Sequence, residues 1–148
     1  MKLSKSQRLH IRYMFGGKCA YCGCDLGDKW HVDHVEAIRR DWEYMKDEHG
    51  NYVTTKDGIT RTRATGKLYA PENDTLENLF PACIKCNILK SAENVEGFRS
   101  TLTYMAHSVP RIEGYSHVRH LIRFGKLTID PTPVVFWFEK YAELTETR

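Results

Sequence analysis

Two Cys-x-x-Cys pairs constrain the fold of this chain more than any other feature of its sequence. Cys19 and Cys22 form the first pair, and Cys83 and Cys86 form the second. Two cysteines at this spacing face the same ion when the backbone between them folds as a turn. Four thiolates from two such pairs are typical of a closed, tetrahedral zinc site. The sequence therefore predicts a structural zinc ion that ties together the two ends of the long stretch between the pairs.

The fifth cysteine, Cys24, is left over by this assignment. It is a spare thiol or an alternative to Cys22 as ligand. Two other readings of the four paired cysteines remain open: unconnected buried cysteines, or a redox-active Cys-x-x-Cys. An odd cysteine count favours a metal over disulfides, and so does a cytoplasmic location, where thiols stay reduced.

We expect a cytoplasmic protein with no membrane association. No stretch of the sequence reaches the roughly 18–20 apolar residues of a membrane span. The segment from Met1 to Lys5 lacks the apolar centre of a signal peptide. With 41% hydrophobic and 28% charged residues, the 148-residue chain can form a normal core. Its net charge of +3 permits nucleic-acid binding without demonstrating it.

Local patterns predict a mixture of helices and strands, and therefore an α+β fold class. Ser4 and Gln7 have the spacing of a capping box, and Gly16-Gly17 can end the helix that it starts. Residues 30–35 are β-branched and aromatic, which predicts a strand. Residues 37–49 are expected to be irregular or helical. Residues 52–63 predict a β-hairpin that turns at Lys56-Asp57-Gly58.

The second half of the chain predicts mostly helices. One helix is expected to start within the second cysteine pair, and apolar spacing predicts others over 95–105 and 116–124. Residues 134–139 give conflicting signals: Pro133 after Thr132 favours a helix start, while the β-branched and aromatic run favours a strand. We expect a helix there. These patterns divide the chain into a core over 1–94, with an insertion near 41–72, and a helical extension over 95–148 packed on it.

The pair Asp33-His34 lies in the predicted strand between the two cysteine pairs. A carboxylate beside an imidazole is compatible with acid–base chemistry, although such a pair is more often a surface or hydrogen-bonded pair. A regular strand sends adjacent side chains to opposite faces. If both residues serve one site, the strand must end or bulge there. His31 has the strand parity of Asp33, so it either approaches the same site or faces solvent.

The order of these motifs resembles the HNH endonuclease family, the ββα-metal nucleases that carry zinc knuckles, in its phage-type form. The matching segments are Cys19–Cys22, Val32-Asp33-His34, Glu77-Asn78-Leu79, and 83–90. The resemblance covers roughly residues 8–91 and is interrupted by the insertion. It implies a ββα-metal core of a two-stranded hairpin and a helix, with zinc knuckles, an inserted β-hairpin and appended helices. Residues 98–138 look similar to tails in some phage-encoded members.

The resemblance also implies roles for individual residues. His34 would be the general base, Asp33 and Asn87 would hold a catalytic Mg²⁺ or Mn²⁺, Asn78 would fix the loop bearing His34, and Lys90 would face a phosphate. Histidine suits the base because its ordinary pKa is close to working pH. Carboxylate and amide oxygens are hard ligands for these ions. The helix differs from family versions that carry two metal-binding histidines, since residue 87 is asparagine and residue 91 is serine, so tight zinc binding at the catalytic site is not expected.

The expected function is therefore metal-dependent hydrolysis of DNA by an endonuclease or nickase, leaving 5′-phosphate and 3′-hydroxyl ends. Alternatives are a non-catalytic, zinc-stabilised module that binds nucleic acid, or an accessory factor of a phage DNA-processing machine. Phage packaging or replication proteins are compatible partners, and the bacterial host cytoplasm is the location if a phage encodes the chain. The target sequence, nicking against double-strand cutting, the preferred metal and the oligomeric state stay open.

Basic residues of the insertion and the second cysteine pair are candidates for DNA contact, because phosphate contacts dominate non-specific affinity. As a group, those of the insertion are the better candidates, since a basic two-stranded ribbon can lie along a groove. Taken individually, each of these residues fits a solvated surface charge at least as well as a DNA contact. The candidates are Arg39, Arg40, Arg61, Arg63, Lys67 and Lys85.

Overall fold

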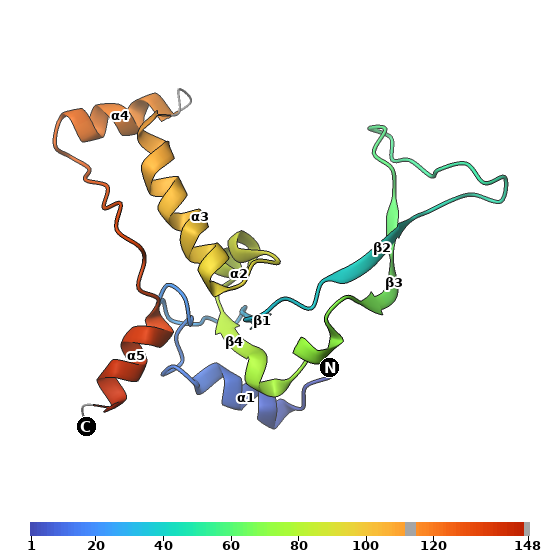
Figure 1. The fold of residues 1–148 in the computed structure, drawn as a ribbon, viewed down its shortest axis with the longest axis horizontal. Coiled ribbons are helices and arrows are strands. Elements are labelled where there is room, and N and C mark those ends of the chain that lie inside the picture. The colour runs from blue at the N-terminus through green and yellow to red at the C-terminus, as the bar shows by residue number, and fades with distance from the viewer. Residues whose placement is uncertain (112–114, 147–148) are drawn as a thin grey trace.

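A computed structural model describes residues 1–111 and 115–146 of the chain (Figure 1). It combines α-helices with two separate two-stranded antiparallel sheets, which confirms the α+β class. Within the described residues, no helix has both the length and the apolar character needed to cross a membrane.

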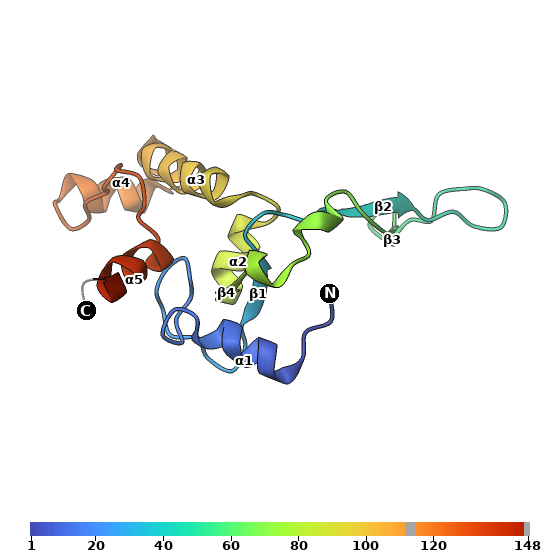
Figure 2. The same cartoon turned by 60° about the horizontal axis from the view of Figure 1, so that its bottom comes forward.

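The first sheet joins segments that are far apart in the sequence. Strand β1 (His31–His34) pairs antiparallel with β4 (Leu79–Ala82), with His31 opposite Ala82 and His34 opposite Leu79. Helix α2 (Ile84–Lys90) follows β4 almost directly and is capped by Cys83. The strand expected over residues 30–35 is therefore confirmed, and so is the helix start within the second cysteine pair. Figure 2 shows β1, β4 and α2 side by side.

The second sheet is a ribbon that projects away from the rest of the chain (Figures 1 and 2). It consists of β2 (Arg40–Tyr44) and β3 (Thr62–Leu68). The expectation that residues 37–49 are irregular or helical is wrong for β2, because its backbone partners lie in the distant β3. The predicted turn is confirmed: the Gly58 N–H donates to the Thr55 carbonyl over 3.1 Å. Around it, however, only an isolated bridge forms, between Thr54 and Thr60.

Helix α1 (Lys5–Tyr13) begins with the capping box predicted from its sequence. The Gln7 N–H donates to the Ser4 hydroxyl over 3.2 Å, and the Ser4 N–H donates to the Gln7 side chain over 2.9 Å. The Arg8 guanidinium lies 4.4 Å from the centre of the Trp30 ring, a cation–π contact that fixes the helix beside β1.

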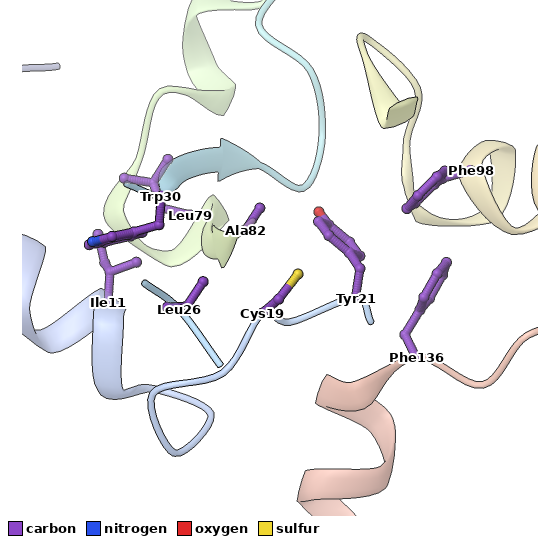
Figure 3. Packing of buried hydrophobic residues seen from close by; sticks show 9 residues of the cluster. All are labelled: Ile11, Cys19, Tyr21, Leu26, Trp30, Leu79, Ala82, Phe98 and Phe136. Atoms are coloured by element: carbon purple, nitrogen blue, oxygen red, sulfur yellow. The ribbon is translucent and has the colours of Figure 1, made fainter. Parts of the chain in front are cut away.

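The hydrophobic core surrounds the first cysteine pair and the β1–β4 sheet (Figure 3). Its members come from α1, from the loop between α1 and β1, from β4, and from the C-terminal third of the chain. Burial of residues so distant in sequence joins the C-terminal helices to the centre of the fold. The cluster consists of Ile11, Cys19, Tyr21, Leu26, Trp30, Leu79, Ala82, Phe98 and Phe136.

The C-terminal third contains α3 (Val95–Ser108), α4 (Ser116–Arg123) and α5 (Trp137–Glu146). The first two confirm the predicted helices. The third begins four residues later than a helix started by Pro133 would. The N–H groups of Trp137 and Phe138, at the start of α5, donate to the carbonyls of Tyr21 and Ala20 over 3.0 and 2.8 Å. The helix expected over 134–139 is therefore confirmed from Trp137 onward and is wrong for residues 134–136, which form neither helix nor strand.

Candidate functional site

The four paired cysteines lie together, as predicted. The Sγ atoms of Cys19, Cys22, Cys83 and Cys86 are all within 4.8 Å of one another. Those of Cys22 and Cys83 are 3.9 Å apart. A tetrahedral zinc ion with Zn–S bonds of about 2.3 Å holds its sulfurs about 3.8 Å apart. The cluster can thus hold a structural zinc ion, and Cys24 is not a member of it.

Backbone hydrogen bonds bring the two cysteine pairs together. The Ala20 N–H donates to the Pro81 carbonyl over 2.8 Å, which places the first pair against β4. The turn of the first pair is closed by the Gly23 N–H, which donates to the Cys19 carbonyl over 3.0 Å. Gly23 has φ of +73°, and a Cβ there would lie 3.1 Å from the Trp137 ring. Glycine is therefore required at this turn for both conformation and space.

The thiols of this cluster are strongly coupled to one another. A hydrogen bond from Cys86 lowers the pKa of the Cys19 thiol to about 4, and the same contact raises the pKa of Cys86. The contact therefore favours the ionised form at Cys19 and the protonated form at Cys86. A divalent cation at the centre of the cluster would replace such protons and neutralise the remaining thiolates.

A hollow of about 470 Å³ lies beside the cysteine cluster, and Asp33, His34 and Asn87 line it together. Strand β1 ends at His34. Beyond it the Val35 N–H donates to the Asn78 carbonyl over 2.9 Å. The end of the strand is what allows adjacent residues to serve one hollow, as the sequence required. Arg39, Arg40 and Trp42 complete the wall toward the ribbon.

Asp33 is buried and takes part in a polar network. The Lys90 ammonium lies 3.1 Å from Oδ2 of Asp33 and donates to the His34 carbonyl over 2.7 Å. The Tyr21 hydroxyl also donates to Oδ2 (Figure 3 shows its ring among the core residues). Burial raises the pKa of Tyr21, and the nearby Asp33 carboxylate adds to this, so the hydroxyl stays a donor. Both contacts use the same oxygen.

The prediction that Lys90 faces a phosphate is wrong. Its side chain has 0% exposure. Sequence spacing placed Lys90 one turn after Asn87, but residues three apart on a helix can still differ in burial, and here the buried Asp33 takes the ammonium. A cation buried next to a carboxylate is stabilising only as a pair.

His34 is held by a residue that no sequence motif singles out. Its Nε2 lies 2.9 Å from Oδ1 of Asp74. The Asp74 pKa is lowered, first by the hydrogen bond from the Met1 amino group and next by His34. An ionised carboxylate only accepts, so Nε2 donates and Nδ1 is the basic nitrogen of the ring.

Asn78 makes three side-chain hydrogen bonds around the turn that follows His34. Its Oδ1 accepts from the Glu36 N–H over 2.9 Å. Its Nδ2 donates to the Glu36 carbonyl over 2.8 Å and to the Asn73 carbonyl over 2.7 Å. An asparagine bound in this way ties the backbone at Glu36, just after β1, to the backbone at Asn73.

Asn87 is oriented by His31, the histidine with the strand parity of Asp33. The Asn87 Nδ2 and the His31 Nδ1 are 3.0 Å apart. Since the amide nitrogen only donates, the His31 Nδ1 accepts and the Asn87 Oδ1 stays available as a ligand. The parity of His31 was therefore the sequence signal for this contact.

The basic candidates divide into three groups. Arg39 and Arg40 line the hollow. Arg63 is paired with Glu43 over 2.6 Å on the ribbon, which reduces its availability. Arg61, Lys67 and Lys85 are exposed.

Comparisons with protein-family models, with curated proteins and with solved structures found no match to this chain.

Two contacts of the site had no signature in the sequence. Tyr21, which bonds Asp33, lies inside a cysteine pair, and Asp74, which bonds His34, lies in an ordinary loop.

Proposed function

We propose that this chain is a metal-dependent DNA endonuclease or nickase of HNH type, in which β1, β4 and α2 form a ββα-metal core. One observation carries the proposal: the adjacent residues Asp33 and His34 and the distant Asn87 line one hollow. The four-cysteine cluster supports it, because a structural zinc there would fix the loop before β1 against the start of α2.

His34 is the proposed general base. Its Nε2 donates to Asp74, which orients the ring and stabilises the imidazolium that forms when Nδ1 takes a proton from water. Asn78 holds the turn after His34, so that the ring stays over the hollow. A positioned base of this kind contributes about 10²- to 10⁴-fold to a rate.

Asp33 and Asn87 are the proposed ligands of the catalytic ion. The contacts with Tyr21 and Lys90 both use Oδ2 of Asp33, and the Asn87 amide nitrogen is held by His31. The Oδ1 atoms of both residues are the hard donors that suit Mg²⁺ or Mn²⁺. When bound, such an ion neutralises charge at the scissile phosphate and the leaving oxygen.

Lys90 weakens the binding of this cation. Its ammonium is 3.1 Å from Asp33, so it compensates the carboxylate before any metal arrives and repels a divalent ion. We therefore infer weak metal binding without DNA and stronger binding when a phosphate adds its charge to the hollow. The guanidinium groups of Arg39 and Arg40 on the wall would hold that phosphate strand.

The same ion pair favours a second candidate function, a zinc-stabilised module that binds nucleic acid without cutting it. A carboxylate that is paired with Lys90 and accepts a hydrogen bond from Tyr21 can be purely structural. In that case Arg39 and Arg40 would still bind phosphate, but Asp33 would hold no metal.

Incubation of supercoiled plasmid with the zinc-loaded chain tests the proposal. The nuclease predicts relaxation that requires added Mg²⁺ or Mn²⁺, with nicks that DNA ligase seals directly because the ends are 5′-phosphate and 3′-hydroxyl. The binding module predicts a mobility shift of the plasmid without nicks under every metal. The replacement Cys83→Ser separates the two ions, since it should remove bound zinc even without DNA.

A further inference from the structure

We propose that one face of the β2–β3 ribbon is a stacking surface for unpaired bases, so that the DNA accepted by the hollow contains a single-stranded segment. This stacking face consists of Trp42 and Tyr44 with their opposite neighbours Ala64 and Thr62. The inference rests on the proposed function, since the same hollow would hold the scissile phosphate. Its test, however, measures binding and needs no cleavage.

The stacking face leaves its aromatic rings uncovered. Residues directly opposite each other in an antiparallel pair project from the same face. Trp42 is opposite Ala64 and Tyr44 is opposite Thr62, so a small side chain lies beside each ring. Trp42 is 57% exposed and Tyr44 is 63% exposed. The ribbon extends into solvent in both views (Figures 1 and 2), which leaves room for a ligand along it.

The other face of the ribbon is a polar network. Glu43 is paired with Arg63 over 2.6 Å. Asp41 accepts hydrogen bonds from the Thr65 hydroxyl over 2.9 Å and from the Tyr69 hydroxyl over 2.7 Å. Asp41 and Glu43 are the acidic residues of the two strands, and both are engaged here. A polyanion therefore meets no carboxylate of these strands on the stacking face.

Trp42 is the residue that ribbon stability does not explain. Tyr44 packs edge-to-face on Tyr52 at 5.7 Å, and Lys46 lies 5.1 Å from the Tyr52 ring, so these tyrosines stabilise the ribbon by packing. In the part of the chain that the structure describes, Trp42 has no ring, cation–π or side-chain hydrogen-bond partner. A large exposed indole without a partner is suited to a ligand with a flat apolar face.

Trp42 also adjoins the catalytic hollow. It lines that hollow with Asp33 and His34, and it lines a second hollow of about 530 Å³ with Arg39, Arg40 and Tyr69. Among the described residues, no ion pair involves Arg39 or Arg40. Arg39 has φ of +29°, a strained conformation for a residue with a side chain and one that is typical of functional sites.

Free guanidinium groups beside an exposed ring are typical of surfaces that bind single strands. The cations follow the phosphate backbone, and each base stacks through its π-face, which is worth about 1–3 kcal/mol per base. In a duplex those faces are already covered by neighbouring base pairs. Trp42 can therefore stack only on a base that is unpaired, as at a gap, a flap or a frayed end.

Binding of fluorescently labelled DNA to the zinc-loaded chain, without added Mg²⁺ or Mn²⁺, tests this inference. The probes are a short single-stranded oligonucleotide and the blunt duplex made from it, followed by anisotropy. Wild type should bind the single-stranded oligonucleotide more tightly than the duplex. Trp42→Ala should weaken single-strand binding by on the order of tenfold or more and leave duplex binding nearly unchanged. Trp42→Phe should restore most of the loss, and Tyr104→Ala, which removes an exposed ring from α3, should have no effect.

Tryptophan emission provides a second readout on the same samples. Stacking should quench part of the wild-type emission when the single strand binds, and Trp42→Phe should abolish that quenching. Equal single-strand affinity of Trp42→Ala and wild type would overturn the inference, and so would quenching that persists in Trp42→Phe. Cleavage of plasmid by a chain that fails these tests would leave the nuclease proposal standing. The reverse result, quenching without cleavage, would retain the stacking face and reject the nuclease.

Discussion

Replacement of Lys90 by methionine should destabilise the chain strongly, although lysine is the residue type most often found at the surface. Lys90 has no exposed surface, and its ammonium contacts both Asp33 and the His34 carbonyl. Methionine has a similar length, so the main loss is electrostatic: the Asp33 carboxylate stays buried without its cation. Removal of one partner from a buried pair costs about 3–5 kcal/mol. Because the Tyr21 hydroxyl still donates to Asp33, we expect about 3 kcal/mol.

Urea unfolding of the zinc-loaded chain, followed by circular dichroism, measures this loss. Lys85→Met is the matched control, because Lys85 is on the same helix but exposed, and it should change stability by less than about 0.5 kcal/mol. The double variant Asp33→Asn/Lys90→Met should lose about 1–3 kcal/mol less stability than the two single variants lose together, because both partners of the pair are then absent. Similar stability of Lys90→Met and Lys85→Met would refute the buried ion pair and the weak metal binding inferred from it.

Three further predictions concern other parts of the chain. Cys83→Ser should lose bound zinc and unfold at lower urea concentration, and retention of the zinc measured by atomic absorption would reject the four-cysteine assignment. Asp74→Asn should lower kcat of DNA cleavage about 10- to 100-fold with little change in KM, because it disturbs the orientation of His34 and leaves the phosphate contacts intact. Asp74→Glu should recover part of the rate. A change confined to KM would contradict this role. The pKa of Glu139 is lowered by the hydrogen bonds from Arg99, even though burial opposes this. The Glu139–Arg99 ion pair contributes about 1 kcal/mol of stability well above the ordinary pKa of a glutamate, and this is lost as the pH falls through the lower, folded-state pKa. Glu139→Gln should therefore flatten the acid side of the plot of stability against pH. An unchanged acid side would show that this ion pair does not stabilise the packing of α5.

The parts of the fold that follow local rules were predictable from the sequence. The capping box at Ser4 and the helix that starts after Cys83 depend on nearby residues. The strand that ends at His34 pairs with the distant β4, but its β-branched and aromatic residues were a local signal for it. The gathering of the four cysteines was also predictable, because ligand spacing implies that distant pairs meet. Local chemistry and ligand geometry therefore indicated the centre of the molecule.

The sequence-based predictions fail where residues distant in the sequence determine the local structure. Residues 40–44 alternate charged and aromatic side chains, a short pattern that does not identify its pairing partner, and they become β2 because β3 supplies the ladder. Lys90 was expected at the surface because helical spacing shows which face a residue occupies, but not that a carboxylate from β1 is buried against that face. The contact of Asp74 with His34 likewise joins a loop to the end of β1, and their approach depends on the whole fold.

The rate of plasmid nicking by wild type and by His34→Ala, at equal zinc content, tests the central claim most directly. His10→Ala is the matched control, since it removes an exposed histidine from α1. Wild type and His10→Ala should nick plasmid at the same rate in Mg²⁺ or Mn²⁺, while His34→Ala should be slower by about 10²- to 10⁴-fold. Nicking by His34→Ala at the wild-type rate, or no nicking by wild type in any of these metals, would contradict a nuclease centre at His34.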